Sequence, residues 1–115
     1  MIGHISQRAT FARLSNEGTY VRSDALWCRF VVDPSLSIPH MGYAVGRQIG
    51  GAVVRNRLRR RLREIMKSHE TDVSPGWYLI GVSQTGRTYR FAQLAGSANR
   101  LIRAIQTHST AEPIQ

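Results

Sequence analysis

Arginine dominates residues 53–66, which read "VVRNRLRRRLREIM" with six Arg and a single Glu in fourteen positions. A guanidinium group binds a phosphate through two parallel hydrogen bonds and also stacks on bases, so this composition is suited to nucleic acid. The whole chain has 16 Lys and Arg residues against seven Asp and Glu, a net charge of +9. Seven of the basic residues and only one acidic residue lie between positions 55 and 67. The charge is therefore a patch, and a patch of this kind predicts a polyanionic partner.

The same segment predicts an amphipathic helix that begins near residues 51–52. At 100° per residue, Val54, Leu58, Leu62 and Ile65 fall within about 80° of one another and form an apolar stripe. Arg61 falls inside this apolar arc, so we expect it to extend outward, to pair with an acid, or to meet RNA at the edge of the helix. The opposite arc is polar and contains Arg55, Asn56, Arg59, Arg60, Arg63 and Lys67.

Three interpretations of this basic helix compete. An ordinary solvated face usually alternates its charges, but positions 55, 59, 63 and 67 are all positive, and each like-charged pair costs a few tenths of a kcal/mol. A membrane-surface helix needs apolar side chains that are free to enter lipid, whereas a chain of 115 residues needs these ones for its core. Phosphate binding is the interpretation that we favour.

No constellation for catalysis by the protein itself is present in the sequence. The four histidines are scattered, and the acidic residues form no cluster of the kind that a metal-dependent nuclease requires. Cys28 is the only cysteine, which excludes an internal disulfide and argues against a zinc site. The segment "GRQIGG" (46–51) lacks the Gly-Lys-Ser/Thr of a phosphate-binding P-loop, and we expect its glycines to permit a tight turn from strand to helix. We therefore predict no catalytic residue and no protein-bound metal or cofactor.

A second candidate feature is the stretch "ALWCRFVVD" (25–33), which predicts a strand. Alternation places Leu26, Cys28, Phe30 and Val32 on one face. The opposite face has Trp27 beside Arg29, an aromatic and basic pairing that can stack an unpaired base.

The remaining patterns predict one α+β domain spanning residues 1–115. We expect a first helix over residues 6–18, a closing helix over 91–105 and further strands over 41–47 and 77–83. Residues 19–22 are a candidate lead into the first strand. Residues 108–115 are expected to form a short flexible tail. Neither a signal peptide nor a membrane span is expected, and a reducing cytoplasm is the simplest location.

Residues 45–64 and the segments that flank them resemble a known family. The segment "VGRQIGGAVVRNRLRRRLRE" (45–64) resembles the signature of the bacterial ribonuclease P protein subunit, in which a strand, a tight turn and an Arg-Asn-Arg helix follow one another. The flanking segments "FARLSNEG" (11–18), "MGYAVGR" (41–47) and "GWYLIGVS" (76–83) agree in order and spacing. The resemblance covers about residues 5–105, and its central motif is the specific part.

The resemblance implies a two-layer α/β sandwich with three helices and a sheet of about four strands. It also implies a left-handed β-α-β crossover through the basic helix, against the usual right-handed rule. In the family, a large catalytic RNA with Mg²⁺ removes the 5′ leader of precursor tRNA, and the protein contributes no catalytic residue. The implied partners are the catalytic RNA and precursor tRNA, with neither DNA nor a membrane expected.

The resemblance also assigns roles by position. Phe11 matches a residue that lines the groove for the single-stranded leader, and the face with Trp27 and Arg29 corresponds to the sheet wall of that groove. Two alternatives remain open: a ribosomal or general RNA-binding protein with a similar basic helix, and a nuclease that acts without RNA. The positions that match the RNA-binding motif are Arg47, Arg55, Asn56, Arg57, Arg59, Arg60 and Arg63. Lys67, at the end of the basic helix, is also expected to bind RNA.

Overall fold

The structure is a computed structural model that describes the backbone of residues 1–111 and the side chains of residues 1–108. Five strands form one mixed sheet in the order β1-β4-β5-β3-β2. The strands are β1 (Gly3–His4), β2 (Thr19–Ser23), β3 (Leu26–Val32), β4 (His40–Ala44) and β5 (Gly76–Val82). The helices are α1 (Arg8–Glu17), α2 (Ala52–Lys67) and α3 (Phe91–Ala111), with short 3-10 turns η1 (Arg47–Ile49) and η2 (Gln84–Thr88) between elements.

The basic helix α2 connects two neighbouring parallel strands, β4 and β5. This confirms the expected β-α-β crossover, while its left-handed sense stays a prediction. Strands β3 and β2 continue the sheet in the antiparallel direction. The fifth strand, β1, is a correction to the expected four, and it pairs in parallel with β4. A strand of two residues has no periodicity that sequence reasoning could detect.

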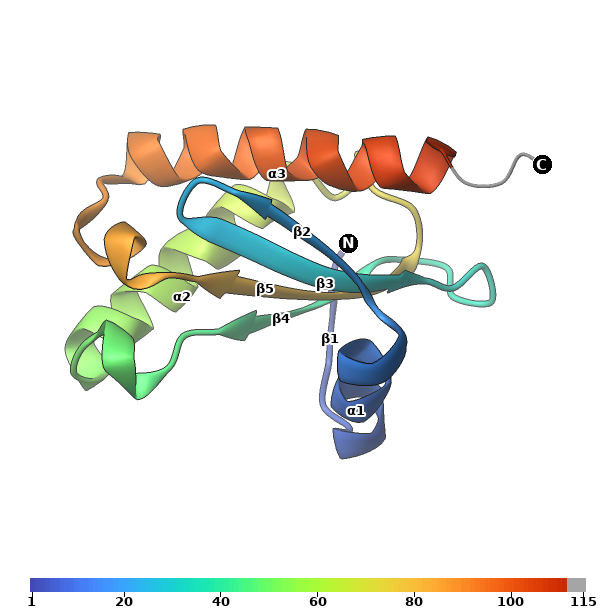
Figure 1. Cartoon of the computed structure of the whole chain (residues 1–115), viewed down its shortest axis with the longest axis horizontal. Coiled ribbons are helices and arrows are strands. Elements are labelled where there is room, and N and C mark those ends of the chain that lie inside the picture. The colour runs from blue at the N-terminus through green and yellow to red at the C-terminus, as the bar shows by residue number, and fades with distance from the viewer. Residues whose placement is uncertain (112–115) are drawn as a thin grey trace.

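Helices α2 and α3 cover one face of the sheet, which we call the core face, and α1 lies at one end of the opposite, outer face (Figure 1). The arrangement is the two-layer sandwich expected from the sequence, with α1 added on the outer face. Much of the outer face therefore remains uncovered by any helix. No helix in the described part of the chain is long and apolar enough to cross a bilayer.

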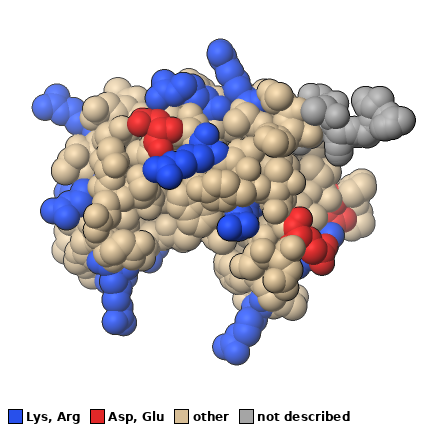
Figure 2. All heavy atoms as spheres, in the orientation of Figure 1, with Lys and Arg blue, Asp and Glu red and all other residues tan. Residues whose placement is uncertain are grey.

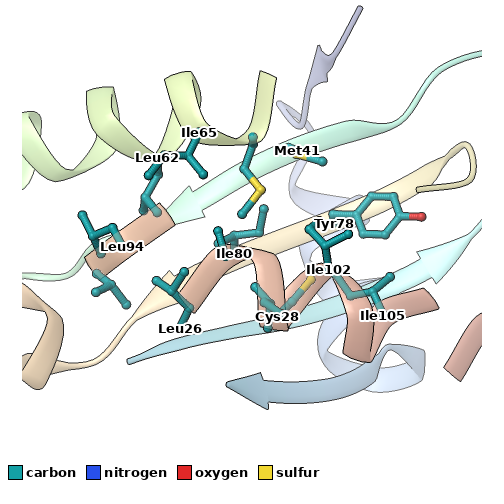
Figure 3. Packing of buried hydrophobic residues seen from close by; sticks show 14 of the residues in the cluster. Leu26, Cys28, Met41, Leu62, Ile65, Tyr78, Ile80, Leu94, Ile102 and Ile105 are labelled. Atoms are coloured by element: carbon teal, nitrogen blue, oxygen red, sulfur yellow. The ribbon is translucent and has the colours of Figure 1, made fainter. Parts of the chain in front are cut away.

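The core lies between the core face and the two covering helices, where side chains from α2, α3 and the central strands point toward one another (Figure 3). The predicted inward face of β3 is confirmed for Leu26, Cys28 and Phe30, whereas Val32 at the strand end is 40% exposed. The apolar stripe of α2 is confirmed as well. Each fully buried Leu or Ile side chain contributes about 1.5–3 kcal/mol through removal of apolar surface from water.

Two element boundaries differ from the sequence prediction. The strand expected over residues 41–47 ends at Ala44, because the chain turns through η1 before α2. Gly50 follows η1 with φ 156°, a conformation that residues with a Cβ rarely adopt, so the expected glycine turn is confirmed. Helix α3 continues to Ala111, so the first part of the expected flexible tail is helical, and residues 112–115 lie outside the described residues.

A polar contact fixes the β2–β3 turn to α3. Asp24 occupies the turn with φ 58°, and its carboxylate accepts hydrogen bonds from the hydroxyls of Ser97 (2.7 Å) and Tyr89 (2.9 Å). Arg100 lies 3.6 Å away on α3. The Ser97 hydrogen bond, followed by that of Tyr89, lowers the pKa of Asp24. These contacts stabilise the ionised carboxylate and connect the edge hairpin to the long helix.

We predict that Asp24→Asn weakens folding in a pH-dependent manner. Asn tolerates a positive φ but lacks the charge. A carboxyl with a lowered pKa in the folded state contributes stability above its unfolded pKa of about 3.9, and this contribution disappears as pH falls through the folded pKa. The thermal midpoint of the variant should therefore lie below that of the unaltered protein at pH 7, and the two should converge as the pH falls below the folded-state pKa of Asp24.

Glu64→Gln is the control, because it removes an exposed carboxylate from the opposite layer. Thermal unfolding followed by circular dichroism at several pH values provides the comparison. An Asp24→Asn deficit of equal size at both ends of the pH range would show that the turn depends on side-chain shape and not on charge.

Candidate RNA-binding surface

Docking of the apolar stripe fixes the rotation of α2 and thereby the direction of every arginine on it. Leu58, Leu62, Ile65 and Met66 are buried against the sheet and α3. Met66, at the margin of the predicted stripe, is fully buried as well and belongs to the same core cluster. The remaining helix surface divides into a solvent-facing crest and two flanks. The crest contains Asn56, Arg60, Glu64 and Lys67, all of which are exposed.

Two arginines are anchored by backbone carbonyls before the helix. The Arg55 Nε donates to the Gly50 carbonyl at 3.1 Å, and Arg59 Nη2 donates to the Val45 carbonyl at 3.2 Å. Arg59 also donates from Nη1 to the Asn56 side chain at 3.1 Å. These bonds hold half-buried guanidinium groups near the helix N-terminus, where the macrodipole favours anions and the first turn has no acidic residue.

One flank of α2 faces a cavity of about 240 Å³ at the edge of β4, which we call the β4-edge cavity. Phe11 from α1, Tyr43 from β4, and Arg59 and Arg63 from α2 line it. Burial raises the pKa of Tyr43 to about 12, so its hydroxyl stays protonated, although nearby Arg63 partly offsets the shift. Three elements thus bring an exposed aromatic ring and two guanidinium groups together around one hollow.

The outer face of the sheet has a second cluster, formed by Tyr20, Trp27 and Arg29. The Tyr20 and Trp27 rings stack with centroids 6.1 Å apart, and the Arg29 guanidinium lies 5.1 Å from the centre of the Tyr20 ring. The indole lies directly over Gly81 of β5, where any Cβ would collide with it. This glycine provides the flat floor on which Trp27 rests.

Not every predicted site residue comes together with the others. Trp27 and Arg29 do not line the β4-edge cavity, so Phe11 and the sheet wall form two separate parts of the candidate groove. In the view of Figure 2, the lower edge is hollowed between a lobe at α1 and one at η1 and the start of α2. Arg47 is exposed in η1, and Lys67 lines another cavity beside β1 together with Arg63.

Sequence reasoning missed Tyr20 and left Arg61 unexplained. Tyr20 stands opposite Arg29 in the β2–β3 register, so alternation along "TYVRS" could have placed it on the outer face once the hairpin was assumed. Arg61 is half-buried, and its Nη1 donates to the Tyr89 carbonyl at 3.4 Å. It therefore extends along the helix edge toward α3, and no ion pair joins it to an acid in the described part of the chain.

A family model that matches nearly the whole chain identifies the family. A family model described as Ribonuclease P matches residues 3–106. The chain belongs to the ribonuclease P family. It is 35% identical over 103 residues to the ribonuclease P protein component of Gluconacetobacter diazotrophicus, covering 86% of this chain and 87% of that one.

Shorter alignments agree with this membership. The ribonuclease P protein component of Beutenbergia cavernae is 36% identical over 70 residues, covering 61% of this chain and 59% of the relative. The ribonuclease P protein component of Roseiflexus castenholzii is 36% identical over 67 residues. This alignment covers 56% of this chain and 55% of the relative, so the chain spans about half of that protein's length.

Solved ribonuclease P proteins share the fold. A Staphylococcus aureus RNase P protein superposes with a TM-score of 0.83 at 20% identity, covering 90% of this chain and 87% of that one. The RNase P protein from Thermotoga maritima gives a TM-score of 0.80 at 20% identity, covering 89% and 96%. The expected α/β sandwich is therefore confirmed as the fold of known ribonuclease P proteins.

The exposed arginines of α2 lead to a prediction about salt dependence. Replacing Arg57 and Arg60 together with Ala should flatten the plot of log affinity for RNA against log salt by about two units at most, since each lost phosphate contact releases one fewer counterion. Arg103→Ala, at an exposed position on α3, is the control and should leave the slope near its original value. Filter binding across a salt series measures both, and an unchanged slope in the double variant would place the two arginines off the RNA interface.

Proposed function

We propose that this chain is the RNA-binding protein subunit of ribonuclease P and assists a catalytic RNA in removing the 5′ leader from precursor tRNA. The observation that supports the proposal most strongly is helix α2, which contains the Arg-Asn-Arg motif. The apolar stripe docks this helix on the core and so fixes the directions of the motif side chains. The outer face supports the proposal further, because it is a partly open sheet with the exposed Tyr20 ring beside the half-buried Trp27 and Arg29.

In the proposed complex the motif residues bind the phosphates of the catalytic RNA. Asn56, Arg57 and Arg60 are exposed, so RNA can approach them without any change in the fold. Arg47 in η1 extends the same cationic surface beyond the helix. Neutralising this charge with phosphate relieves the repulsion between neighbouring arginines and releases counterions, and both effects favour binding.

The single-stranded leader lies, in this proposal, along the hollow between α1 and the start of α2. Its unpaired bases have two aromatic contacts, Phe11 at the β4-edge cavity and Trp27 on the sheet wall. Stacking on aromatic rings tolerates any base, so this arrangement suits leaders of varied sequence. Arg29 lies over the Tyr20 ring that stacks on Trp27, and Arg63 lines the cavity with Phe11. Both arginines would bind the leader's phosphates.

The reaction itself is assigned to the RNA. Mg²⁺ held by the catalytic RNA would activate the water that attacks the scissile phosphate. The protein's role in this proposal is to hold the leader and to screen phosphate repulsion. Precursor then binds better than product because only precursor has the leader.

We expect the purified protein to cleave no precursor tRNA alone and to raise cleavage by a bacterial ribonuclease P RNA at low Mg²⁺. The expected benefit is greatest at low Mg²⁺ because the arginines replace part of the charge screening that the ions otherwise supply. Single-turnover cleavage of a labelled precursor, with and without protein, tests the proposal. An absence of any stimulation would refute it.

A binding comparison and a ribonuclease control separate two other classes of protein. A general or ribosomal RNA-binding protein would bind precursor and mature tRNA equally well. A nuclease that needs no RNA would remain active after the preparation is treated with ribonuclease and repurified.

Trp27→Ala should reduce the preference for precursor over mature tRNA by roughly tenfold, because stacking of one base is worth about 1–3 kcal/mol. Trp27→Phe keeps a ring over Gly81 and should restore most of the preference. Trp77→Phe is the matched control, because Trp77 donates to Asp33 and contacts His40 elsewhere on the sheet. Equal weakening of both tRNA forms by Trp27→Ala would show that Trp27 does not contact the leader.

A further inference from the structure

A cavity of about 390 Å³ lies on the flank of α2 opposite the β4-edge cavity. Four arginines line it: Arg57 and Arg61 from α2, Arg87 from η2, and Arg90 at the start of α3. We call it the arginine pocket. Its rim includes the Phe91 ring, which is 40% exposed. Sequence spacing could not assemble it, because two of its arginines lie about thirty positions away from the other two.

The pocket has no internal source of negative charge. None of its four arginines forms an ion pair in the described part of the chain, and none of its lining residues is acidic. In the described part of the chain, the guanidinium groups of these four arginines make a single hydrogen bond, from Arg61 to the Tyr89 carbonyl. Four guanidinium groups around one hollow repel one another, and that repulsion is relieved when an anion enters.

The walls of the pocket are held in place before any ligand arrives. The Tyr89 hydroxyl donates to Asp24, so the backbone carbonyl that holds Arg61 is fixed from the β2–β3 turn. The backbone N–H of Arg90 donates to the Gln93 side chain at 2.8 Å, which orders the start of α3. Gln84 of η2 donates to the Gln48 carbonyl of η1 at 2.8 Å, joining the two loops beside α2.

The start of α3 adds to the positive potential. Helix α3 has 21 residues and no acidic residue in its first turn, so its N-terminal dipole is uncompensated there. Arg90 directly precedes this end and lines the pocket. Charge, cavity and helix end therefore favour the same kind of ligand, a phosphate group.

We propose that the arginine pocket binds a backbone phosphate of the catalytic RNA, with Phe91 offering its ring to the adjoining ribose or base. The proposal rests on the proposed function for the identity of this RNA. Positions 57 and 61 lie about 200° around the helix from positions 59 and 63. A leader in the hollow beside Phe11 would have to cross the crest of α2 to reach the pocket, which leaves this flank to the other RNA.

The assignment gives Arg61 a function. A guanidinium inside an apolar arc is unfavourable in isolation, but at this edge it completes a phosphate site while its aliphatic stem covers apolar surface. Arg57 belongs both to the family's motif and to the pocket, so the pocket extends the motif surface from α2 toward η2 and α3.

The test is binding of a bacterial ribonuclease P RNA transcript, without tRNA, to the full chain. Arg87→Gln combined with Arg90→Gln should weaken binding about tenfold or more and lower the salt slope by about one to two units. Arg103→Gln, at an exposed position on α3, is the control. For each charge removed, it should lower the affinity and the salt slope less than the Arg87 and Arg90 changes do. Circular dichroism and the thermal midpoint verify that each variant folds.

A second pair of variants addresses Arg61 alone. Arg61→Lys keeps the charge but loses the planar fork, and Arg61→Gln loses both, so affinity for the transcript should fall in that order. Equal affinity for all three proteins would overturn the role assigned to Arg61.

Three outcomes decide the proposal. Selective weakening by the Arg87 and Arg90 changes, with an unchanged ratio of precursor to mature tRNA binding, supports it. Binding like that of Arg103→Gln overturns it, as does a fall in the precursor preference with intact transcript binding, which would assign the pocket to substrate. Failure of the unaltered protein to bind the transcript at all would instead refute the proposed function.

Discussion

The structure depends on one contact, the docking of the α2 apolar stripe on the sheet between β4 and β5. The buried side chains of the stripe include Leu58, Leu62 and Ile65. Their burial contributes about 25 cal/mol of stability per Å² of apolar surface and so fixes the rotation of the helix. Once that rotation is set, the direction of each arginine follows from its helical angle. The crest faces solvent, one flank faces Phe11 and the edge of β4, and the other faces α3.

The cost of this arrangement is concentrated charge. Each like-charged pair along α2 opposes helix formation by a few tenths of a kcal/mol. Of the six acidic residues in the described part of the chain, only Glu64 lies on α2. Any ligand that binds only the folded chain stabilises it in proportion to the logarithm of its concentration over Kd. An RNA partner would therefore stabilise the fold on binding. Because the surface is basic, both the RNA affinity and this added stability should depend strongly on salt.

The outer face follows a different principle. Cross-strand neighbours there combine aromatic rings and a guanidinium with a glycine floor, which suits the stacking of bases that we propose for this face. The placement of α1 at only one end leaves this surface accessible. The two kinds of RNA contact that we propose, charge on α2 and stacking on the sheet, thus lie on separate elements of one small domain.

Much of this protein could be predicted from the sequence alone, because local periodicity reports burial directly. The pattern of α2, the alternation of β3 and the motif at 45–64 were sufficient for the fold class, the basic helix and the family. Strand β1, the stacking of Tyr20 on Trp27 and the union of Arg61 with Arg87 and Arg90 were decided only by tertiary structure. Each of these features joins residues that are distant in the chain. Such contacts form only when the elements pack together, so the sequence spacing does not predict them.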